Sequence, residues 1–280
     1  MKVIKSSNQL QQILQQLRMR GKRIGFVPTM GYLHEGHVSL VRRARRENDV
    51  TVVSIFVNPT QFGPKEDFKN YPRDLRRDKR LLSTERVDYL FTPDRSSIYP
   101  KGFRNYINPG PVARYLCGAK RPGHFRGVAT VVNRLFEIVR PHRAYFGEKD
   151  YQQLKVIENM VRKQNLKIRI QGCPIVREKD GLTMSSRNRY LSKTERIRAQ
   201  ALFQSLNLAK RLVREGKKSP KQIKQTTEVF LAPYVDRLDY FELVDAEKLV
   251  PLKRLKPPIL IALACFVGQT RLIDNLVLKR

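Results

Sequence analysis

Cysteine is scarce in this sequence, and its few copies are widely spaced. Cys117, Cys173 and Cys265 include no Cys-x-x-Cys pair, and their number is odd. Both features argue against the disulfide framework of a small secreted domain, because such a framework needs paired cysteines. We therefore expect a protein of the reducing cytoplasm.

Long apolar runs are missing as well. The longest, residues 259–267, is much shorter than the ~20 residues that a bilayer-spanning helix needs. Residues 1–4 lead directly into a polar, glutamine-rich stretch, so the apolar centre of a secretory signal is absent there. We expect no membrane partner. At 280 residues and 41% hydrophobic composition, the chain can nevertheless form buried cores and is near the length at which one core divides into two.

Acidic residues are also few. The sequence has 25 Asp and Glu residues against 56 Lys and Arg residues, which gives a formal net charge of +31. A field of this sign attracts nucleic acid, anionic lipid and polyphosphates. The basic residues are spread over nearly every amphipathic segment, as in residues 42–46, which is typical of solvated helix faces. We expect no specific nucleic-acid partner, and a basic nucleic-acid-binding protein remains the weaker alternative.

The first half of the chain alternates strand-like and helix-like segments. This alternation predicts an α/β fold with a parallel sheet that carries helices on both faces. The expected strands are residues 23–29, 50–57, 87–91, 144–146 and 167–175, and the expected helices are residues 36–48, 72–85, 123–139 and 150–165.

The second half has a different order. Two helices at about 193–215 and 220–231 precede strands at 239–244, 259–267 and 271–278, and Gly268 to Thr270 predicts a hairpin between the last two. This order indicates a smaller α+β domain. We divide the chain into residues 1–178 and residues 179–280.

The segment from Pro28 to His37 lies where the first of these strands gives way to a helix. Open parallel sheets bind ligands at such loops, and a helix N-terminus offers free N–H groups and partial positive charge to phosphate. His34 and His37, three residues apart, can both face one ligand, and Gly31 and Gly36 allow a close backbone approach. A zinc-protease helix is excluded because its second histidine would be four residues on.

Two further segments carry polar side chains suited to phosphate. Phe146 to Gln153 again joins a strand to a helix, where Lys149 is a compact cation, Asp150 can cap the helix or hold a ribose, and Gln153 lies one turn on. Met184 to Arg187 offers two hydroxyls and a guanidinium fork. Gly181 nearby predicts a mobile lid. Taken alone, either segment fits an ordinary helix start or polar linker.

Polar groups suited to a small acceptor lie between these segments. Asn58 and Gln61 follow a buried strand, and their amides can donate to and accept from hydroxyls and a carboxylate. His124 and Arg126 begin a helix and are expected at the rim of the pocket. His142, between Pro141 and Arg143, is interpreted as structural.

In this order, the segments resemble the pantothenate synthetase (pantoate–β-alanine ligase) family. The similarity runs over essentially the whole chain, and several blocks together are highly specific. The blocks are Pro-Thr-Met-Gly-Tyr-Leu-His-Glu-Gly-His (28–37), Phe-Val-Asn-Pro-Thr-Gln-Phe (56–62), Tyr-Pro-Arg-Asp (71–74), Gly-His-Phe-Arg-Gly (123–127), Phe-Gly-Glu-Lys-Asp (146–150) and Met-Ser-Ser-Arg (184–187).

The resemblance implies a Rossmann-like N-terminal domain, a C-terminal lid domain and a homodimer. It also implies a two-step reaction with Mg2+ and ATP and without a tightly bound organic cofactor. The carboxylate of pantoate attacks the α-phosphorus of ATP to give pantoyl adenylate and pyrophosphate, and the amine of β-alanine then displaces AMP to form pantothenate. A related nucleotidyltransferase with another acceptor is the main alternative.

The family pattern also implies roles for individual positions. His37 is the proton donor or charge stabiliser, Gln61 contacts both pantoate and β-alanine, and Gln153 is a second pantoate contact. Asp78 matches an acidic position near the metal, but Arg76 and Arg77 differ from the acidic or small neighbours often found there, so we assign no metal ligand. The implied ATP contacts are Met30, Gly31, Tyr32, Leu33, His34, Glu35, Gly36, His37, Gly147, Glu148, Lys149, Asp150, Val176, Met184, Ser185, Ser186 and Arg187.

Overall fold

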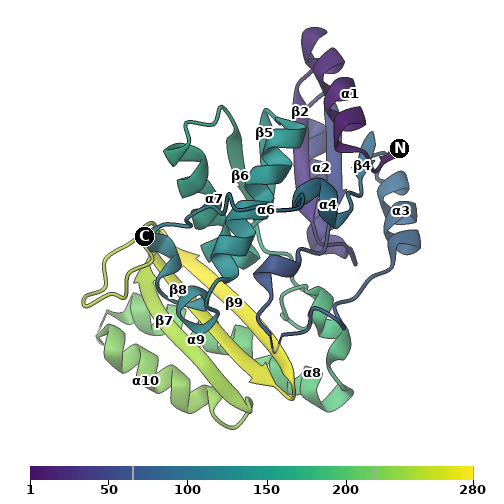
Figure 1. The fold of residues 1–280 in the computed structure, drawn as a ribbon. Coiled ribbons are helices and arrows are strands. Elements are labelled where there is room, and N and C mark those ends of the chain that lie inside the picture. The colour runs from purple at the N-terminus through teal and green to yellow at the C-terminus, as the bar shows by residue number, and fades with distance from the viewer. Residues whose placement is uncertain (65, 217–218, 280) are drawn as a thin grey trace. The chain divides into compact units, whose positions relative to one another are not determined.

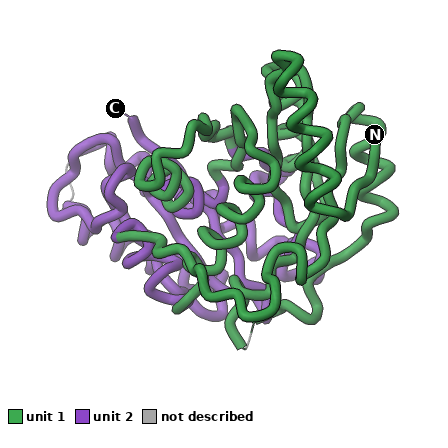
Figure 2. Tube along the Cα trace, turned by 45° about the horizontal axis from the view of Figure 1, so that its top comes forward, with its two compact units in different colours: residues 1–110, 122–148, 156–174 green, residues 111–121, 149–155, 175–280 purple. Residues whose placement is uncertain are grey.

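The computed structural model describes residues 1–64, 66–216 and 219–279. The chain forms two compact units, shown in green and purple in Figure 2. Unit 1 comprises residues 1–110, 122–148 and 156–174, and unit 2 comprises residues 111–121, 149–155 and 175–280. Among the described residues, every helix is too short or too polar to cross a membrane.

Unit 1 is built on a six-stranded parallel sheet (Figure 1). Its strand order is β1-β4-β3-β2-β5-β6, so the chain steps outward from β2 through β3 to β4 and later returns to add β5 on the other side of β2. The strands are β1 (Lys2–Ile4), β2 (Ile24–Thr29), β3 (Val50–Ile55), β4 (Tyr89–Phe91), β5 (Arg143–Gly147) and β6 (Arg169–Cys173).

Helices cover both faces of this sheet. Crossovers between parallel strands are right-handed, so the reversal of direction after β4 changes the face on which the following helices lie. The helices α2 (Glu35–Glu47) and α3 (Leu75–Thr84) therefore lie on one face. The helices α1 (Ser7–Met19), α6 (His124–Val139) and α7 (Tyr151–Lys163) belong to the other, where α1 packs against α6.

The core of unit 1 follows from the sequence pattern of these elements. The β-branched strand β3 is buried along nearly its whole length, as expected for a central parallel strand. On α2, Val41 and Ala44 are buried together with Val38 and Leu40, so an apolar stripe faces the sheet, while Arg42, Arg45 and Arg46 are exposed. Between β3 and β5 in the sequence, the shorter elements of unit 1 are η1 (Pro59–Gln61) and α4 (Arg95–Ile98), and those of unit 2 are η2 (Pro111–Ala113) and α5 (Cys117–Lys120).

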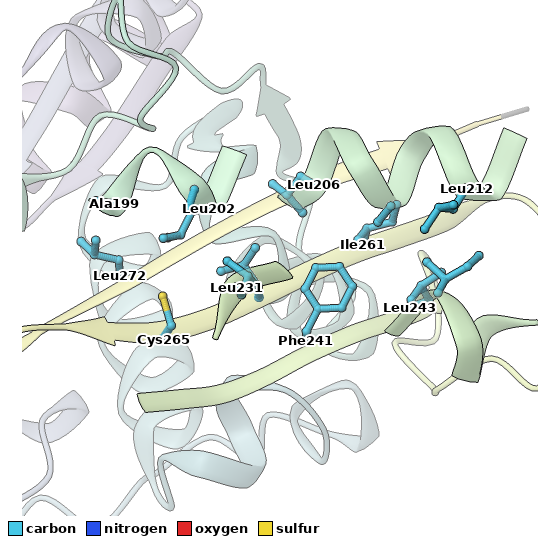
Figure 3. Close-up of a cluster of buried hydrophobic side chains, with 14 of the residues drawn as sticks. Ala199, Leu202, Leu206, Leu212, Leu231, Phe241, Leu243, Ile261, Cys265 and Leu272 are labelled. Atoms are coloured by element: carbon cyan, nitrogen blue, oxygen red, sulfur yellow. The ribbon is translucent and has the colours of Figure 1, made fainter. Parts of the chain in front are cut away.

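Unit 2 contains a three-stranded antiparallel sheet in the order β7-β8-β9. The strands are β7 (Arg237–Asp245), β8 (Ile259–Val267) and β9 (Thr270–Leu278), and the helical elements are η4 (Ser186–Tyr190), α8 (Lys193–Ala199), α9 (Ala201–Glu215) and α10 (Pro220–Leu231). The short η3 (Glu148–Asp150) begins with the last residue of a unit 1 segment and continues into unit 2. Figure 3 shows Leu206 and Leu212 with Ile261 and Phe241 in the buried cluster between these helices and the sheet. The hairpin predicted at Gly268 is confirmed, because β8 and β9 pair from Val267 and Thr270 onward.

The structure differs from the sequence expectation at two places. The glutamine-rich start of the chain forms β1 and then α1, because Ser6 caps the helix and Leu10 and Leu14 are both fully buried on one face. The expected helix 193–215 is divided at Gln200, whose N–H bonds to the carbonyl of Ile197 at 3.3 Å in a tighter turn. The remaining strands and helices occur where they were predicted, with ends shifted by a few residues.

Candidate functional site

The loop after β2 lies beside the position where the strand order changes direction, since β2 is paired with both β3 and β5. Ligands of open parallel sheets bind outside the carboxyl ends of strands at such a point. Thr29 ends β2, donates a hydrogen bond to the carbonyl of Ser54 at 2.8 Å and accepts one from the N–H of Gly31 at 3.1 Å. These two bonds fix the direction in which the loop leaves the sheet.

A buried carboxylate holds the next residues of this loop. Asp78 of α3 is 1% exposed and accepts hydrogen bonds from the N–H groups of Tyr32 at 2.7 Å and Leu33 at 2.8 Å. Burial raises the pKa of this carboxyl, although the two N–H donors oppose the shift. Asp78, which the family pattern had placed near a metal, therefore positions the loop backbone through both of its oxygens.

The backbone of this loop also requires an unusual conformation. Gly31 and Tyr32 have φ values of 81° and 50°, in the left-handed region that favours glycine. A Cβ atom at Gly31 would lie 2.9 Å from Cγ2 of Ile55 and 3.2 Å from Oδ2 of Asp78. The loop therefore needs glycine at position 31 both for its φ angle and for its close approach to Asp78.

His34 and His37 come together at the start of α2, as their spacing predicted. Their ring centroids are 4.1 Å apart, and the N–H of His34 points at Nδ1 of His37 at 3.4 Å. A neutral His37 ring that accepts at Nδ1 carries its proton on Nε2. The carboxylate of Glu35 is not directed at the two histidine rings, because it pairs with Arg42 farther along the same helix.

Gln61 is held from two sides after β3. Its Oε1 accepts a hydrogen bond from Nδ2 of Asn58 at 3.1 Å, and its Nε2 lies 3.0 Å from the sulfur of Met30. Gln61 is 8% exposed, so its amide is buried beside the β2–α2 loop. The structure thus joins Met30 and Gln61, two predicted site residues that are separated in the sequence.

Asn58 orients Gln61 and is fully engaged within the protein. Its Nδ2 donates to Gln61 and to the carbonyl of Gly127 at 3.1 Å. Its Oδ1 accepts from the hydroxyls of Tyr99 at 2.8 Å and Thr60 at 3.0 Å. We had expected Asn58 to face a small substrate, and the structure instead gives it a role in fixing the amide of its neighbour. Sequence reasoning missed Tyr99 because no local pattern links it to Asn58.

The start of α6 closes the other side of Gln61. Nδ1 of His124 lies 2.8 Å from the carbonyl oxygen of Gln61, while Arg126 stacks over the ring of Tyr106 at 5.2 Å. A Cβ atom at Gly127 would lie 2.3 Å from the carbonyl oxygen of Thr60. Glycine at this position therefore lets α6 pack directly on η1.

We predict that Gly127→Ala displaces η1. Overpacking of this kind costs about 1–3 kcal/mol in the free energy of unfolding, and here the displaced backbone carries Gln61. Chemical denaturation and acceptor binding both measure the effect. Gly63→Ala is the control, because its added Cβ would meet the nearest side chain at an ordinary 3.7 Å. Equal stability of the two variants would contradict the packing argument.

Gly147 ends β5, which is adjacent to β2 in the sheet, and Glu148 follows it. A Cβ atom at Gly147 would have no described neighbour within 4 Å, so the backbone is open to a bound molecule there. Within unit 1, the predicted residues Met30 to His37, Gln61, Gly147 and Glu148 thus all lie at or after the carboxyl ends of β2, β3 and β5.

Unit 2 holds the other predicted residues. The carbonyl oxygen of Lys149 accepts a hydrogen bond from Nδ2 of Asn275 at 2.8 Å, and Nζ of Lys149 lies 3.6 Å from the carboxylate of Asp150.

The two adjacent glutamines of α7, Gln152 and Gln153, have different roles. Gln152 is buried and donates to the carbonyls of Val112 and Tyr115, whereas the side-chain amide of the half-buried Gln153 makes no hydrogen bond to the described residues and can meet a ligand.

The segment from Val176 to Arg187 forms a turn that is held by hydrogen bonds. The N–H of Met184 binds the carbonyl of Val176 at 3.0 Å, and Ser185 caps η4 by accepting from the N–H of Arg187 at 3.3 Å. Gly181 has a φ of 89°, and a Cβ atom there would lie 2.6 Å from the ring of Phe203. The turn geometry and this close packing therefore explain the glycine that we had associated with mobility.

Among the residues that the structure describes, no three His, Cys, Asp or Glu side chains are arranged to hold a metal ion. Mg2+ usually binds through one or two carboxylates together with substrate phosphates and keeps several waters. The described residues therefore form no cage of protein ligands for a metal ion.

Comparisons with known proteins agree over the full length of the chain. The family model for pantoate-beta-alanine ligase matches residues 2–277. Pantothenate synthetases from Thermosipho melanesiensis and Thermotoga petrophila are 53% and 52% identical, each over 99% of this chain and over 99% and 100% of their own lengths.

Solved structures show the same fold. The crystal structure of pantothenate synthetase from Thermus thermophilus superposes with a TM-score of 0.94 at 45% identity, over 100% of both chains. A pantoate-beta-alanine ligase from Francisella tularensis, complexed with beta-gamma ATP and beta-alanine, gives a TM-score of 0.84 at 36% identity, over 99% of this chain and 97% of that one. The chain belongs to the pantoate–β-alanine ligase family.

Proposed function

We propose that this chain condenses pantoate with β-alanine to pantothenate, with cleavage of ATP to AMP and pyrophosphate. One observation carries the proposal: a chain that matches the ligase family over residues 2–277 places a His34–His37 pair and a buried Gln61 at the same edge of its parallel sheet.

The nucleotide is assigned to the loop and helix start after β2. The α2 N-terminus supplies N–H donors and partial positive charge, and the histidine pair faces the developing charge on the α-phosphoryl oxygens. His37 stabilises that charge, since a neutral ring donates from Nε2. The proposed ATP contacts are Met30, Gly31, Tyr32, Leu33, His34, Glu35, Gly36, His37, Gly147, Glu148, Lys149, Asp150, Val176, Met184, Ser185, Ser186 and Arg187.

The acceptor is assigned to the two glutamine amides. Gln61 is oriented by Asn58, so it presents a fixed amide to the carboxylate and hydroxyls of pantoate and later to β-alanine. Gln153 is the second pantoate contact. The Francisella ligase was crystallised with a nucleotide and β-alanine, which supports both substrate classes here.

The two steps follow from the low reactivity of a carboxylate toward amines. Attack of a pantoate oxygen on the α-phosphorus breaks the bond to the bridging oxygen, and pyrophosphate leaves with that electron pair. The amine of β-alanine then attacks the activated carbonyl, loses a proton and expels AMP. Adenylation thus replaces one difficult displacement by two easier ones.

Several finer assignments belong to the same proposal. Mg2+ binds with the triphosphate and neutralises its charge. The protein is a cytoplasmic homodimer, residues 1–178 hold ATP and pantoate, and residues 179–280 form the smaller lid domain.

The activity is tested by incubating the protein with ATP, pantoate and β-alanine. We expect equimolar AMP, pyrophosphate and pantothenate, with AMP release dependent on β-alanine. Release of ADP, or turnover with a different acid in place of pantoate, would contradict the proposal and favour a nucleotidyltransferase with another acceptor.

A further inference from the structure

Two segments of unit 2 that we assign to ATP are far apart in the chain, and each is linked to one of two adjacent residues of β9. Lys149 and Asp150 end η3 and directly precede α7, whereas the segment from Met184 to Arg187 includes the start of η4, which contacts β9. Asp274 and Asn275 lie at the middle of β9, and both side chains are buried. This inference rests on the proposed function, because it concerns how those ATP contacts are held.

Asp274 anchors the second segment through Arg177. The guanidinium donates to both carboxylate oxygens, with Nη1 at 2.6 Å and Nη2 at 2.9 Å, and it stacks on the ring of Phe203 at 4.0 Å. A bidentate pair of this kind fixes orientation as well as distance. Since the carboxylate of Asp274 is 0% exposed, it depends on Arg177 for compensation of its charge.

Arg177 links Asp274 to the 184–187 segment that we assign to ATP. Its Nη1 also donates to the carbonyl of Gly181 at 3.0 Å, and its backbone forms a bridge with Thr183. Thr183 directly precedes Met184, whose own N–H binds Val176. The carboxylate of Asp274 therefore fixes the position in space of the start of the 184–187 segment.

Asn275 anchors the first segment. Its Nδ2 donates to the carbonyl oxygen of Lys149 at 2.8 Å, while its own N–H donates to Oδ1 of Asp274 at 2.7 Å. The same carboxylate thus accepts from both Arg177 and Asn275. The backbone position of Lys149 is consequently coupled to that of the 184–187 segment through two adjacent residues.

We propose that Asp274 and Asn275 are positioning residues that set the spacing between Lys149 and the 184–187 segment, and thereby the affinity for ATP. A triphosphate bound by a lysine and a hydroxyl–arginine segment needs both at fixed distances, because misplaced contacts lose most of their strength. Neither side chain touches the nucleotide in this account.

The test is Asn275→Ala, which removes the bond to Lys149 and leaves Arg177 in place. Loss of one such bond corresponds to about a tenfold rise in KM for ATP, with KM for pantoate unchanged. Gln152→Ala is the matched control, since it also removes a buried amide that donates to backbone carbonyls in unit 2. We expect the control to lower Tm and to leave KM for ATP unchanged.

A second variant covers the case in which Asn275→Ala does not fold. Arg177→Lys keeps the charge opposite Asp274 but cannot form the bidentate pair, so we expect weaker ATP binding in calorimetry with an unchanged circular dichroism spectrum. Normal ATP affinity in a folded Asn275→Ala or Arg177→Lys protein would overturn the inference. Failure of the proposed function would appear instead as absence of AMP formation by the unaltered protein.

Discussion

The variant His37→Ala is expected to lose about 100- to 1,000-fold in kcat, the usual effect of removing a group that stabilises charge in the transition state. Its stability should change little. His37 is half-buried at the first turn of α2, and the alanine that replaces it favours helix. Steady-state turnover and thermal unfolding of the same preparation measure both effects.

His142 provides the control for this prediction. Its Nδ1 accepts the N–H of Ile24 at 2.9 Å at the start of β2, the end of the strand opposite to the site. We expect His142→Ala to lower the free energy of unfolding by about 1 kcal/mol and to keep normal kcat. Near-normal turnover in His37→Ala would remove that histidine from the catalytic role.

Asp78→Ala is expected to have the second largest effect. The substitution leaves the N–H groups of Tyr32 and Leu33 buried without their acceptor, at a cost of about 1–3 kcal/mol for each. The loop that we assign to ATP would then relax from its left-handed conformation, so KM for ATP should rise at least about tenfold. Denaturant unfolding and ATP titration test the two parts separately.

Asp74→Ala is the matched control on the same helix. Asp74 caps α3 by accepting the N–H of Arg77 at 2.9 Å, in an exposed position. Loss of this cap costs about 1 kcal/mol in stability and should leave KM for ATP unchanged. A rise in KM of similar size in both variants would show that Asp78 acts only through the stability of α3.

The sequence predicts the order of strands and helices well where the pattern is strong. The β-branched run of β3 and the apolar stripe of α2 identify their elements without tertiary information. The sequence does not predict α1, because only Leu10 and Leu14 of this polar segment are buried and its apolar face is therefore narrow. The break at Gln200 has no local signal, because its neighbours favour helix on both sides.

In the candidate site as well, contacts between near neighbours in the sequence can be predicted, whereas contacts between distant residues cannot. Spacing alone brings His34 and His37 together, because residues three apart share one helix face. The role of Asp78 depends on contacts 45 and 46 residues away, and that of Asp274 on a partner 97 residues away. Such partners follow from tertiary packing, and neither carboxylate has a local pattern that would identify it.

The proposed first step, attack of a pantoate oxygen on the α-phosphorus of ATP, can be followed with an isotope. Pantoate labelled with 18O in its carboxylate, incubated with ATP, β-alanine and the protein, tests this step directly by mass spectrometry of the products. We expect one 18O atom in AMP and one retained in the amide carbonyl of pantothenate. Unlabelled AMP, or label in inorganic phosphate, would contradict it.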